Sequence, residues 1–495
     1  MKVLLVSYSG KPLHPDNFIP DNGLAQLAGC VREAGHECVV HYLNTPRLLW
    51  ELNSHAKVEA DLMHKVRQVH PDVIGFKLYI NGFYDSLKLA EAVKTQFPGI
   101  KLLAGGPQIT YFEEKIFLVT REFDVLTTGE GERAITGILE ALEGKRELST
   151  VPNIIYLEHG VPRKTGRIYS EQLGELPDPA WDVYDKQFRD LWPIMVFTIS
   201  RGCSVKCAFC THPYIWGDRF RSRPMDAIMR EVAGAKAQYG FRHFRLADST
   251  PVPGMLERFS QAIIDKSLDI RWSGYAYARM INPSVLRLMK TAGCIFLWYG
   301  LESANEAILT SMNKKIVAGN MMEAARMTRE AGITYLTSLI VGFPGETEES
   351  IEETFAFVKQ MRPDSVQVTA LGLVPQTPLA RDPEKYGITA EANWELSLMN
   401  MRFAGMDEAS TKGKGYYTSG GKPWEYWQEK ATELVRRFDG ENLLTQTTDD
   451  LHLMADVAGM EIREFRQRVQ GCMQSGDQAG MERLIRQSWK NATAA

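Results

Sequence analysis

The stretch that decides the fold is Ser200-Arg201-Gly202-Cys203-Ser204-Val205-Lys206-Cys207-Ala208-Phe209-Cys210, which directly follows a run of β-type residues at 196–200. Three of the seven cysteines lie within the eight residues from Cys203 to Cys210, with the spacing Cys-x3-Cys-x2-Cys. Three thiolates on one loop can ligate three irons of a cubane [4Fe–4S] cluster and leave the fourth iron without a protein ligand. A metal ion with an open coordination position is suited to substrate chemistry.

A structural zinc site is the alternative use of these cysteines. Zinc needs four ligands, and His212 is the nearest residue that can supply the fourth. The spacing is not one that zinc ribbons use, however, and three structural cysteines on one short loop by chance are rarer still. The loop therefore predicts an iron–sulfur cluster held by Cys203, Cys207 and Cys210.

The residues around the cysteine loop alternate between strand and helix patterns. Strands are expected at 196–200, 243–247, 270–276, 295–300, 335–341 and 365–371, with helices at 224–238, 255–266, 283–292, 317–331 and 348–360. These six β/α units fall short of the eight in a complete barrel. We expect a partial (β/α)6 TIM-type barrel over 194–380, with the cysteine loop at the carboxyl end of its first strand.

The cysteine loop resembles the signature of the radical S-adenosylmethionine (SAM) superfamily, including the aromatic Phe209 before the last cysteine. The resemblance extends over about 180 residues through further motifs: Tyr299-Gly300-Leu301-Glu302-Ser303, Met312-Asn313-Lys314, Ile340-Val341-Gly342-Phe343-Pro344-Gly345-Glu346-Thr347 and Val374-Pro375-Gln376-Thr377-Pro378-Leu379. It implies that the fourth iron binds the amino and carboxylate groups of SAM. Reduction of the cluster then cleaves SAM to methionine and a 5′-deoxyadenosyl radical, which abstracts hydrogen from the substrate.

The resemblance also implies which residues bind SAM. Glu302 and Ser303 end a strand at the barrel mouth, where a carboxylate can accept from ribose hydroxyls, and Gly342 lets the backbone approach adenine closely. Ser249, in Asp248-Ser249-Thr250, occupies the place where the family often binds the SAM amino group, although Gly-Gly-Glu is commoner there. Phe209 completes the predicted SAM contacts. The alternative for each is plain packing at the end of the barrel.

The first 145 residues follow a βαβα pattern of their own. Strands are expected at 2–8, 37–43, 73–79, 101–104 and 124–127, with helices at 22–34, 56–69, 84–95 and 132–142. This pattern predicts a doubly wound Rossmann or flavodoxin-like parallel sheet, with ligand contacts at the carboxyl ends of its strands. Residues 129–134 fit G-x-G-x-x-A, but they follow the fifth strand instead of the first, so we reject a dinucleotide fingerprint.

The strand ends of this region together resemble the cobalamin-binding domain that precedes many radical SAM barrels. The motifs are Ile80-Asn81-Gly82, Gly105-Gly106-Pro107-Gln108-Ile109-Thr110 and Gly129-Glu130-Gly131-Glu132. The cobalamin contacts that the resemblance implies are Tyr79, Asn81, Gly82, Gly105, Gly106, Pro107, Gln108, Thr110, Gly129, Glu130, Gly131 and Glu132. Its Asp-x-His-x-x-Gly motif is absent, so bound cobalamin is expected to lack a protein imidazole ligand, although His14 can still approach. The alternative is a flavodoxin-like domain that only docks on the barrel.

The remaining segments are less informative. Residues 146–193 carry five prolines and a Gly-Val-Pro turn, which predicts a linker with a small hairpin, and residues 381–495 predict a small, mostly helical C-terminal domain. Tyr214 and Trp216, just after the cysteine loop, either line the pocket as substrate contacts or simply cover the barrel. The segment Lys412-Gly413-Lys414-Gly415-Tyr416-Tyr417 either gates the site or is a solvated loop. We favour the interpretation as a solvated loop.

Composition limits the class of partner. The chain has 495 residues, with 57 Lys and Arg against 61 Asp and Glu, and its net charge of −4 argues against a general nucleic-acid binder. No apolar run approaches the ~20 residues of a membrane-spanning helix. Seven cysteines are an odd number, and a secreted disulfide scaffold would be shorter and richer in cysteine. We expect a cytoplasmic enzyme with a small-molecule substrate and a reductant such as flavodoxin or ferredoxin.

Two cofactors in one chain predict methyl transfer to an unactivated carbon, because such a carbon cannot attack SAM directly and must first become a radical. The alternative is a cobalamin-dependent cyclase, oxidoreductase or rearrangement enzyme that transfers no methyl group. An RNA methylthiotransferase needs three N-terminal cysteines, and only Cys30 and Cys38 are present there. A maturase with auxiliary clusters needs several C-terminal cysteines, and only Cys472 is available. A non-enzymatic iron–sulfur protein would not need the SAM motifs.

Overall fold

The structure, a computed structural model, describes residues 1–10, 20–45, 47–79, 82–184, 192, 194–248, 252–400 and 416–484. These residues form two compact units, one that includes the described residues up to 192 together with 399 and 400, and one that includes the described residues of 194–398 and 416–484. His14, Asn81, Ser249 and the segment 412–415, all singled out above, lie outside the described residues. Within the described residues, no helix is both long and apolar enough to cross a membrane.

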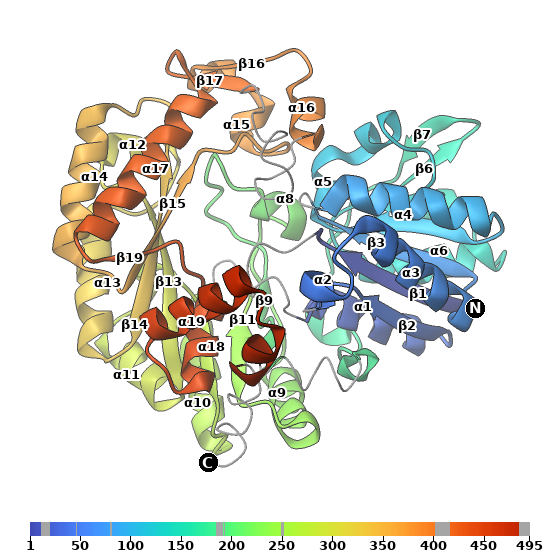
Figure 1. The fold of residues 1–495 in the computed structure, drawn as a ribbon, viewed down its shortest axis with the longest axis horizontal. Helices are drawn as coiled ribbons and strands as arrows, with labels where there is room; N and C mark the ends of the chain where they lie inside the picture. The colour runs from blue at the N-terminus through green and yellow to red at the C-terminus, as the bar shows by residue number, and fades with distance from the viewer. Residues whose placement is uncertain are drawn as a thin grey trace. The chain divides into compact units, whose positions relative to one another are not determined.

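The first unit is built on a seven-stranded sheet in the order β2-β1-β3-β4-β5-β6-β7, whose first five strands are parallel. Helices cover both faces of this sheet (Figure 1). The β1 strand pairs with both β2 and β3, so the strand order reverses there, which is the switch point expected of a doubly wound fold. The elements are β1 (Lys2–Tyr8), α1 (Asn22–Glu33), β2 (Glu37–Tyr42), α2 (Arg47–Trp50), α3 (His55–Val69), β3 (Val73–Leu78), α4 (Phe83–Gln96), β4 (Lys101–Gly105), α5 (Pro107–Phe112), η3 (Glu113–Leu118), β5 (Val125–Thr127) and α6 (Glu132–Leu142).

The hairpin expected in the linker belongs to this sheet. The strands β6 (Ile154–Glu158) and β7 (Val161–Lys164) pair with each other, and β6 also pairs antiparallel to β5, extending the sheet by two strands. Short β-type runs between prolines do not reveal in the sequence that they join a neighbouring sheet. The short helices η4 (Leu148–Thr150), η5 (Leu173–Glu175) and η6 (Trp181–Val183) complete the segment. The expected domain boundaries stay a prediction.

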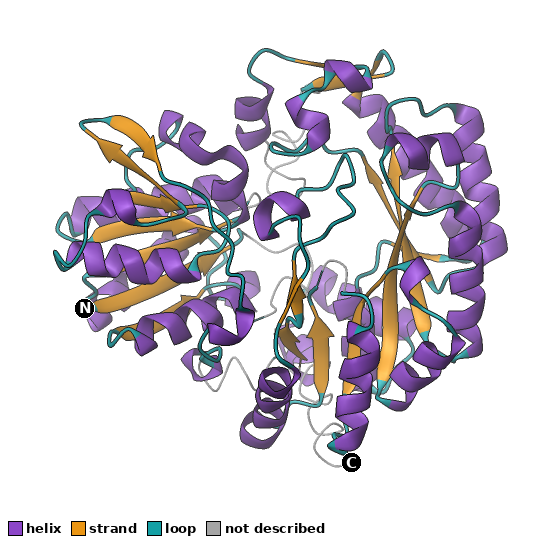
Figure 2. Cartoon of the chain, turned by 180° about the vertical axis from the view of Figure 1, so that it is seen from behind, coloured by secondary structure: helices purple, strands orange, loops and turns teal. Residues whose placement is uncertain are grey.

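The second unit contains the predicted partial barrel. Its main sheet has the order β19-β15-β14-β13-β12-β11-β8, and all of its pairs are parallel. Figure 2 shows the strands of this unit as orange arrows with purple helices packed beside them. All six predicted strands are present, as β8 (Ile194–Phe197), β11 (His243–Leu246), β12 (Arg271–Ala276), β13 (Cys294–Glu302), β14 (Thr334–Val341) and β15 (Ser365–Ala370). The helices between them are α9 (Met225–Tyr239), α10 (Met255–Asp265), α11 (Pro283–Thr291), α12 (Glu306–Ser311), α13 (Ala318–Glu330) and α14 (Glu348–Met361), with η7 (Ala278–Met280) after β12.

The C-terminal part is mostly helical, as predicted, but it also supplies a seventh strand to the barrel sheet. This strand, β19 (Leu444–Thr445), pairs with β15. A two-residue strand is too short to be recognised as a pattern. The other elements are α15 (Pro378–Arg381), η8 (Glu384–Tyr386), β16 (Ile388–Ala390), α16 (Trp394–Asn400), β17 (Tyr417–Ser419), β18 (Lys422–Pro423), α17 (Trp424–Gly440), α18 (Asp449–Ala458) and α19 (Ile462–Ser475).

The helix α18 lies on the inner face of the barrel strands. Phe244 of β11 points to the outer face of the sheet. Its ring contacts the Phe197 ring, and Phe197 contacts Phe259 of α10, a helix on the outside of the barrel. Residues alternate across a strand, so the next residue of β11, Arg245, points inward. There Arg245 Nε donates to Asp449 Oδ2 of α18 at 2.8 Å. An acidic helix thus occupies the amino-terminal part of the barrel, which leaves the carboxyl ends of the strands for the site.

Candidate functional site

The cysteine loop lies between β9 (Ser200–Arg201) and α8 (His212–Trp216), and the barrel fixes it from two sides. The amide of Ala208, in the middle of the loop, donates to the carbonyl of Met312 at 2.8 Å, and its carbonyl accepts from the amide of Leu379 at 3.0 Å. Asn313 Nδ2 donates to the carbonyl of Lys206 at 2.9 Å. Two of the motifs predicted from the sequence therefore anchor the loop backbone on both sides of Cys207.

The three thiols form the donor set expected of the cluster site. Cys203 is buried, Cys207 and Cys210 are half-buried, and all three are free. Burial is the main reason that the pKa of the Cys207 thiol is raised to about 12; the Lys314 charge opposes this rise, and charges on Cys210, Glu302 and Cys203 contribute to it. No three described His, Cys, Asp or Glu side chains already form a metal-binding group. The fit therefore rests on three thiols on one anchored loop, which suit three irons of a [4Fe–4S] cluster.

Asp248, at the end of β11, fixes the start of the cysteine loop. Its Oδ1 accepts from the amide of Ile199 at 2.8 Å, and its Oδ2 accepts from the Ser200 hydroxyl. Complete burial raises the pKa of this carboxyl to about 7. Asp248 thus has a positioning role that the sequence did not reveal, and the neighbouring Ser249 lies outside the described residues.

Glu302 and Lys314 form a buried ion pair at the mouth of the barrel. Lys314 Nζ donates to Glu302 Oε1 at 2.7 Å, and the two side chains are about 10% exposed. Ser338 of β14 donates to the other carboxylate oxygen at 3.3 Å. The charges of Glu302 and Cys207 favour the protonated ammonium of Lys314 and raise its pKa against the opposing effect of burial. Lys314 was quoted as part of a motif but was not among the predicted site residues.

Ser303 and Gly342 are placed differently from Glu302. Ser303 is fully buried, and its hydroxyl lies 3.4 Å from Thr354 Oγ1 of α14, so it faces the outer helices. At Gly342 (φ +92°), an added Cβ would lie 2.5 Å from Cγ of Trp427 in α17. The close approach predicted at this glycine is therefore made in the structure by the Trp427 indole. Among the described residues, neither the Ser303 hydroxyl nor the Gly342 backbone forms a hydrogen bond with the Glu302–Lys314 pair.

The aromatic residues after the third cysteine pack against arginines. The guanidinium of Arg381 lies 5.0 Å from the Tyr214 ring, and that of Arg201 lies 5.1 Å from the Trp216 ring. Phe209 is half-buried on the cysteine loop itself. Tyr214 and Trp216 thus help to hold α8 beside the loop, and a contact of either with substrate stays a prediction.

In the first unit, Thr110 connects two of the predicted cobalamin motifs. Its Oγ1 donates to the Gly106 carbonyl at 3.0 Å and accepts from the Gly129 amide at 2.9 Å. Pro107 and Gln108 start α5 directly after Gly106, which has φ +97°. The carboxyl ends of β4 and β5 are therefore joined into one rim.

Most of the predicted glycines are required by the packing of the chain itself. A Cβ on Gly82 would lie 2.5 Å from the Ser9 carbonyl carbon, and one on Gly106 would lie 3.1 Å from the Leu78 carbonyl oxygen. A Cβ on Gly131 would lie 3.3 Å from Leu27. Gly105 differs, because its nearest neighbour would be Thr127 Cβ at 3.6 Å, an ordinary contact. Of Gly82, Gly105, Gly106 and Gly131, only Gly105 has space in place of a side chain that the described residues do not fill.

The polar members of the predicted cobalamin set are mostly engaged within the first unit. The Tyr79 hydroxyl donates to Asp21, which caps α1 and also binds Lys77. Glu130 Oε2 accepts from the Ser170 amide at 2.7 Å, and Glu132 is buried at the start of α6. Gln108 is fully buried, and its side-chain amide has no hydrogen-bond partner among the described residues. Gln108 thus combines complete burial with unused hydrogen-bonding capacity.

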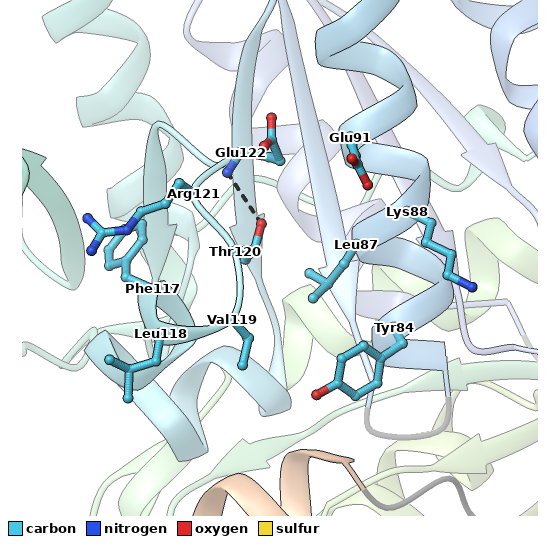
Figure 3. Close-up of a pocket in the computed structure, with 10 residues that line it drawn as sticks. All are labelled: Tyr84, Leu87, Lys88, Glu91, Phe117, Leu118, Val119, Thr120, Arg121 and Glu122. Carbon is cyan, nitrogen blue, oxygen red and sulfur yellow. Dashed lines mark hydrogen bonds between the residues drawn. The ribbon is translucent and has the colours of Figure 1, made fainter. Parts of the chain in front are cut away.

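A separate cavity of about 610 Å³ opens on the first unit between α4 and the segment after η3 (Figure 3). The amide of Glu122 donates to Thr120 Oγ1 at 3.3 Å beside it. It is lined by Tyr84, Leu87, Lys88, Glu91, Phe117, Leu118, Val119, Thr120, Arg121 and Glu122. None of these is a predicted site residue, so the cavity is distinct from the rim formed by Gly106, Thr110 and Gly129.

The chain matches two family descriptions that correspond to the two units. Residues 13–139 match the B12 binding domain, and residues 197–358 match the radical SAM superfamily. The first match includes the Thr110 rim, and the second extends from β8 into α14 and includes the cysteine loop and Glu302. The cofactors of these domains are cobalamin for the first and a [4Fe–4S] cluster with SAM for the second.

Individual relatives cover most of the chain. An uncharacterized methyltransferase of Pyrococcus horikoshii, PH0819, is 28% identical over 380 residues, which are 76% of this chain and 81% of the relative. The anaerobic magnesium-protoporphyrin IX monomethyl ester cyclase of Cereibacter sphaeroides is 23% identical over 73% of this chain and 60% of its own length. The structure of the radical SAM methyltransferase TsrM from Kitasatospora setae, with cobalamin and a [4Fe–4S] cluster bound, superposes with a TM-score of 0.72 at 15% identity, covering 97% of this chain and 99% of that one. This last likeness shows that the fold is shared.

Proposed function

Because this chain is a cobalamin-dependent radical SAM enzyme, we propose that it transfers a methyl group from SAM to an unactivated carbon of a small molecule. The observation that carries the proposal is the presence of both domains in one chain. It is supported by the extent of the matches, which cover 81% of the methyltransferase PH0819 and 99% of the methyltransferase TsrM. When bound, cobalamin supplies a methyl carrier, and the cluster with SAM supplies a hydrogen-abstracting radical.

The residues of the barrel support the radical half of this chemistry. Cys203, Cys207 and Cys210 would hold the cluster, and Asp248 keeps the start of their loop in place through Ile199 and Ser200. The Glu302 carboxylate is already oriented by Lys314 and Ser338, so it can accept from a ribose hydroxyl with little rearrangement. Phe209, Ser249, Ser303 and Gly342 remain predicted SAM contacts.

The cobalamin half would use the rim at the carboxyl ends of β4 and β5. Thr110 fixes the backbone of Gly106 and Gly129 there, and Gly105 leaves room beside β5. The buried Gln108 amide can hydrogen-bond an amide side chain of the corrin. Tyr79, Asn81, Gly82, Pro107, Glu130, Gly131 and Glu132 remain predicted contacts.

A cyclase reaction without methyl transfer is the second candidate, because the Cereibacter sphaeroides relative carries that name. Methyl transfer is favoured, since the Pyrococcus horikoshii relative has the higher identity and is covered over 81% of its length against 60% for the cyclase. We further propose that a one-electron reductant such as flavodoxin or ferredoxin is a partner. We propose no nucleic-acid partner, because the net charge of the chain is −4. We propose that the protein is located in the cytoplasm, where free cysteines stay reduced.

The proposal is tested without knowing the substrate. Protein expressed with cobalamin and purified without oxygen is expected to hold about one cobalamin per chain. After reduction, SAM with a deuterated methyl group is expected to pass that group to the bound cobalamin and leave S-adenosylhomocysteine, both measured by mass spectrometry. Bound cobalamin that takes up no labelled methyl group contradicts methyl transfer and favours the cyclase class.

A further inference from the structure

The inner faces of β12 and β13 form tiers along the inside of the barrel. In the lower tier, the Ser273 hydroxyl donates to Asp449 of α18 at 3.3 Å. One step higher, the rings of Tyr275 and Trp298 stack with centroids 5.3 Å apart and planes at 25°. Inward residues recur at every second position of a strand. Tyr277 is two residues beyond Tyr275 and is still extended, with φ −104° and ψ 124°, so it continues the same inward face.

The strand register places Tyr277 next to the buried ion pair. Ala276 pairs with Tyr299 across the parallel strands, so the residues that follow, Tyr277 and Gly300, are neighbours. A Cβ on Gly300 would clash with Glu302 Oε1 and Lys314 Nζ, so both charged groups lie directly over this glycine. Tyr277, Glu302 and Lys314 therefore form the top tier of the barrel interior, above the Tyr275–Trp298 stack.

The phenol of Tyr277 has an unused hydrogen bond. Its Oη is buried, although the ring as a whole is half-buried, and it has no hydrogen-bond partner among the described residues. Burial raises the pKa of Tyr277, the Lys314 charge opposes this rise, and charges on Cys207 and Cys203 add to it. The phenol is therefore protonated at neutral pH and can donate a hydrogen bond. As a neighbour of Gly300, it lies beside the Glu302–Lys314 pair.

A buried hydroxyl without a partner is unfavourable unless a ligand satisfies it. A ligand group that suits both an ammonium and a phenol donor is an anion, and a carboxylate offers several acceptor positions. We propose that Tyr277 is a positioning residue that donates from Oη to the carboxylate of SAM, beside Lys314. The inference rests on the proposed function because SAM is the ligand in both, but it assigns a residue that belongs to none of the motifs predicted to bind SAM.

The test is a titration of SAM into the reduced, cluster-loaded protein, followed by the change in the electron paramagnetic resonance spectrum of the cluster. Tyr277→Phe is expected to keep the wild-type iron and sulfide content. The SAM concentration at half-maximal spectral change is expected to rise about tenfold or more, because a hydrogen bond to a charged group is lost. Tyr275→Phe is the matched control, because it removes the same hydroxyl one tier lower, where Arg245 binds it. Equal titration of wild type and Tyr277→Phe overturns the proposal.

Unfolding of the cluster-free protein separates a ligand-binding from a structural role. Tyr277→Phe removes an unpartnered hydroxyl, so its urea midpoint is expected to equal or exceed that of the wild type, whereas Tyr275→Phe loses a hydrogen bond and is expected to unfold earlier. A lower midpoint for Tyr277→Phe means that its hydroxyl has a structural partner and contradicts the proposal.

An analogue of SAM with a carboxamide in place of the carboxylate locates the contact. Tyr277→Phe is expected to bind this analogue as well as the wild type does, because the charged acceptor is missing in both cases. An equal loss of affinity for SAM and for the amide assigns the phenol to another part of the ligand and overturns the proposal. Failure of cobalamin to take up labelled methyl, with the SAM titrations as expected, contradicts only the proposed function.

Discussion

The carboxyl ends of the two parallel sheets differ in how much of a site they already form. In the barrel, residues from β13, β14 and the segment after α12 meet in one buried group, since Glu302 contacts both Lys314 and Ser338. In the first unit, the predicted residues mostly bind other parts of that unit, as Tyr79 binds Asp21 and Glu130 binds Ser170. The site in the barrel is therefore formed mainly by side chains, and the site in the first unit mainly by the backbone.

We attribute this difference to the ligands that the two sites are proposed to hold. A cluster and a SAM carboxylate are held by a few charged or sulfur atoms, which must be placed accurately and therefore need side chains. A wide, flat macrocycle is held by shape and backbone contact, for which glycines and a rigid rim suffice. Substitutions should therefore act on binding chemistry in the barrel and on space or backbone packing in the first unit.

The largest expected effect is at the cysteine loop. Replacing Cys203, Cys207 and Cys210 together with Ala is expected to abolish the cluster and all SAM cleavage, because no thiolate remains on the loop. Iron and sulfide content and the visible absorption of the purified protein measure this. Cys472→Ala, on α19 of the same unit, is the control and is expected to keep wild-type iron. Retention of iron and sulfide in the triple variant would contradict the assignment.

The next effect is on the buried ion pair. Lys314→Met leaves the Glu302 carboxylate buried without its partner, which is expected to cost about 3–5 kcal/mol of unfolding free energy, measured in urea. The double variant Glu302→Gln/Lys314→Met is expected to recover part of that loss, because no buried charge remains. Lys359→Met is the control at an exposed ion pair with Glu441 and should cost about 1 kcal/mol or less.

A Lys314→Met variant as stable as Lys359→Met would show that the Glu302–Lys314 pair is not buried in solution. Glu302→Ala and Glu302→Gln are also expected to weaken SAM binding while the cluster content is unchanged. Unchanged SAM affinity would remove Glu302 from the site and leave it as a structural residue of the barrel mouth.

Sequence patterns predicted more of the barrel site than of the site in the first unit, because local motifs specify chemistry whereas pairing and contacts between distant segments depend on the fold. The cysteine spacing and the strand-end motifs specify chemistry directly, so the loop, Glu302 and the six barrel strands were all predicted. Asp248 was missed in its actual role because an acidic residue at a strand end does not reveal which amides it accepts from. The strand β19 and the hairpin β6–β7 were missed as sheet members because pairing between distant segments depends on tertiary packing.

The roles of glycines were the hardest to predict. Gly82, Gly106 and Gly342 were all assigned to ligand contact, yet each accommodates a close approach by the chain itself, at Ser9, Leu78 and Trp427. A glycine in a sequence signals that something comes close, or that φ is positive, without saying what comes close. Only the folded structure separates glycines that accommodate the chain from one such as Gly105 that leaves free space.

A pH effect is expected at Asp248, which holds the first residues of the cysteine loop. Its folded pKa of about 7 lies above the value of about 3.9 for an unfolded Asp. The native state therefore binds the proton more tightly, and this contribution to stability is full below pH ~4 and is lost as pH rises to ~7. Asp248→Asn is expected to flatten that part of the profile of unfolding free energy against pH, and the exposed Asp265→Asn is not. Parallel profiles for Asp248→Asn and the wild type would mean that the carboxyl titrates as it does in water.

The smallest effect on stability, and the sharpest test of the first unit, is at Gly105. Gly105→Ala adds a methyl group at an ordinary 3.6 Å from Thr127, so unfolding free energy is expected to change by about 0.5 kcal/mol or less. The neighbouring Gly106→Ala is the control, because φ +97° strains any other residue, and it should cost about 1–3 kcal/mol. If the space at Gly105 belongs to cobalamin, Gly105→Ala should lower the cobalamin content per chain despite its normal stability, as measured by absorption. A full cobalamin content in Gly105→Ala would place the macrocycle elsewhere on the sheet, and the free space at this strand end would then need another occupant.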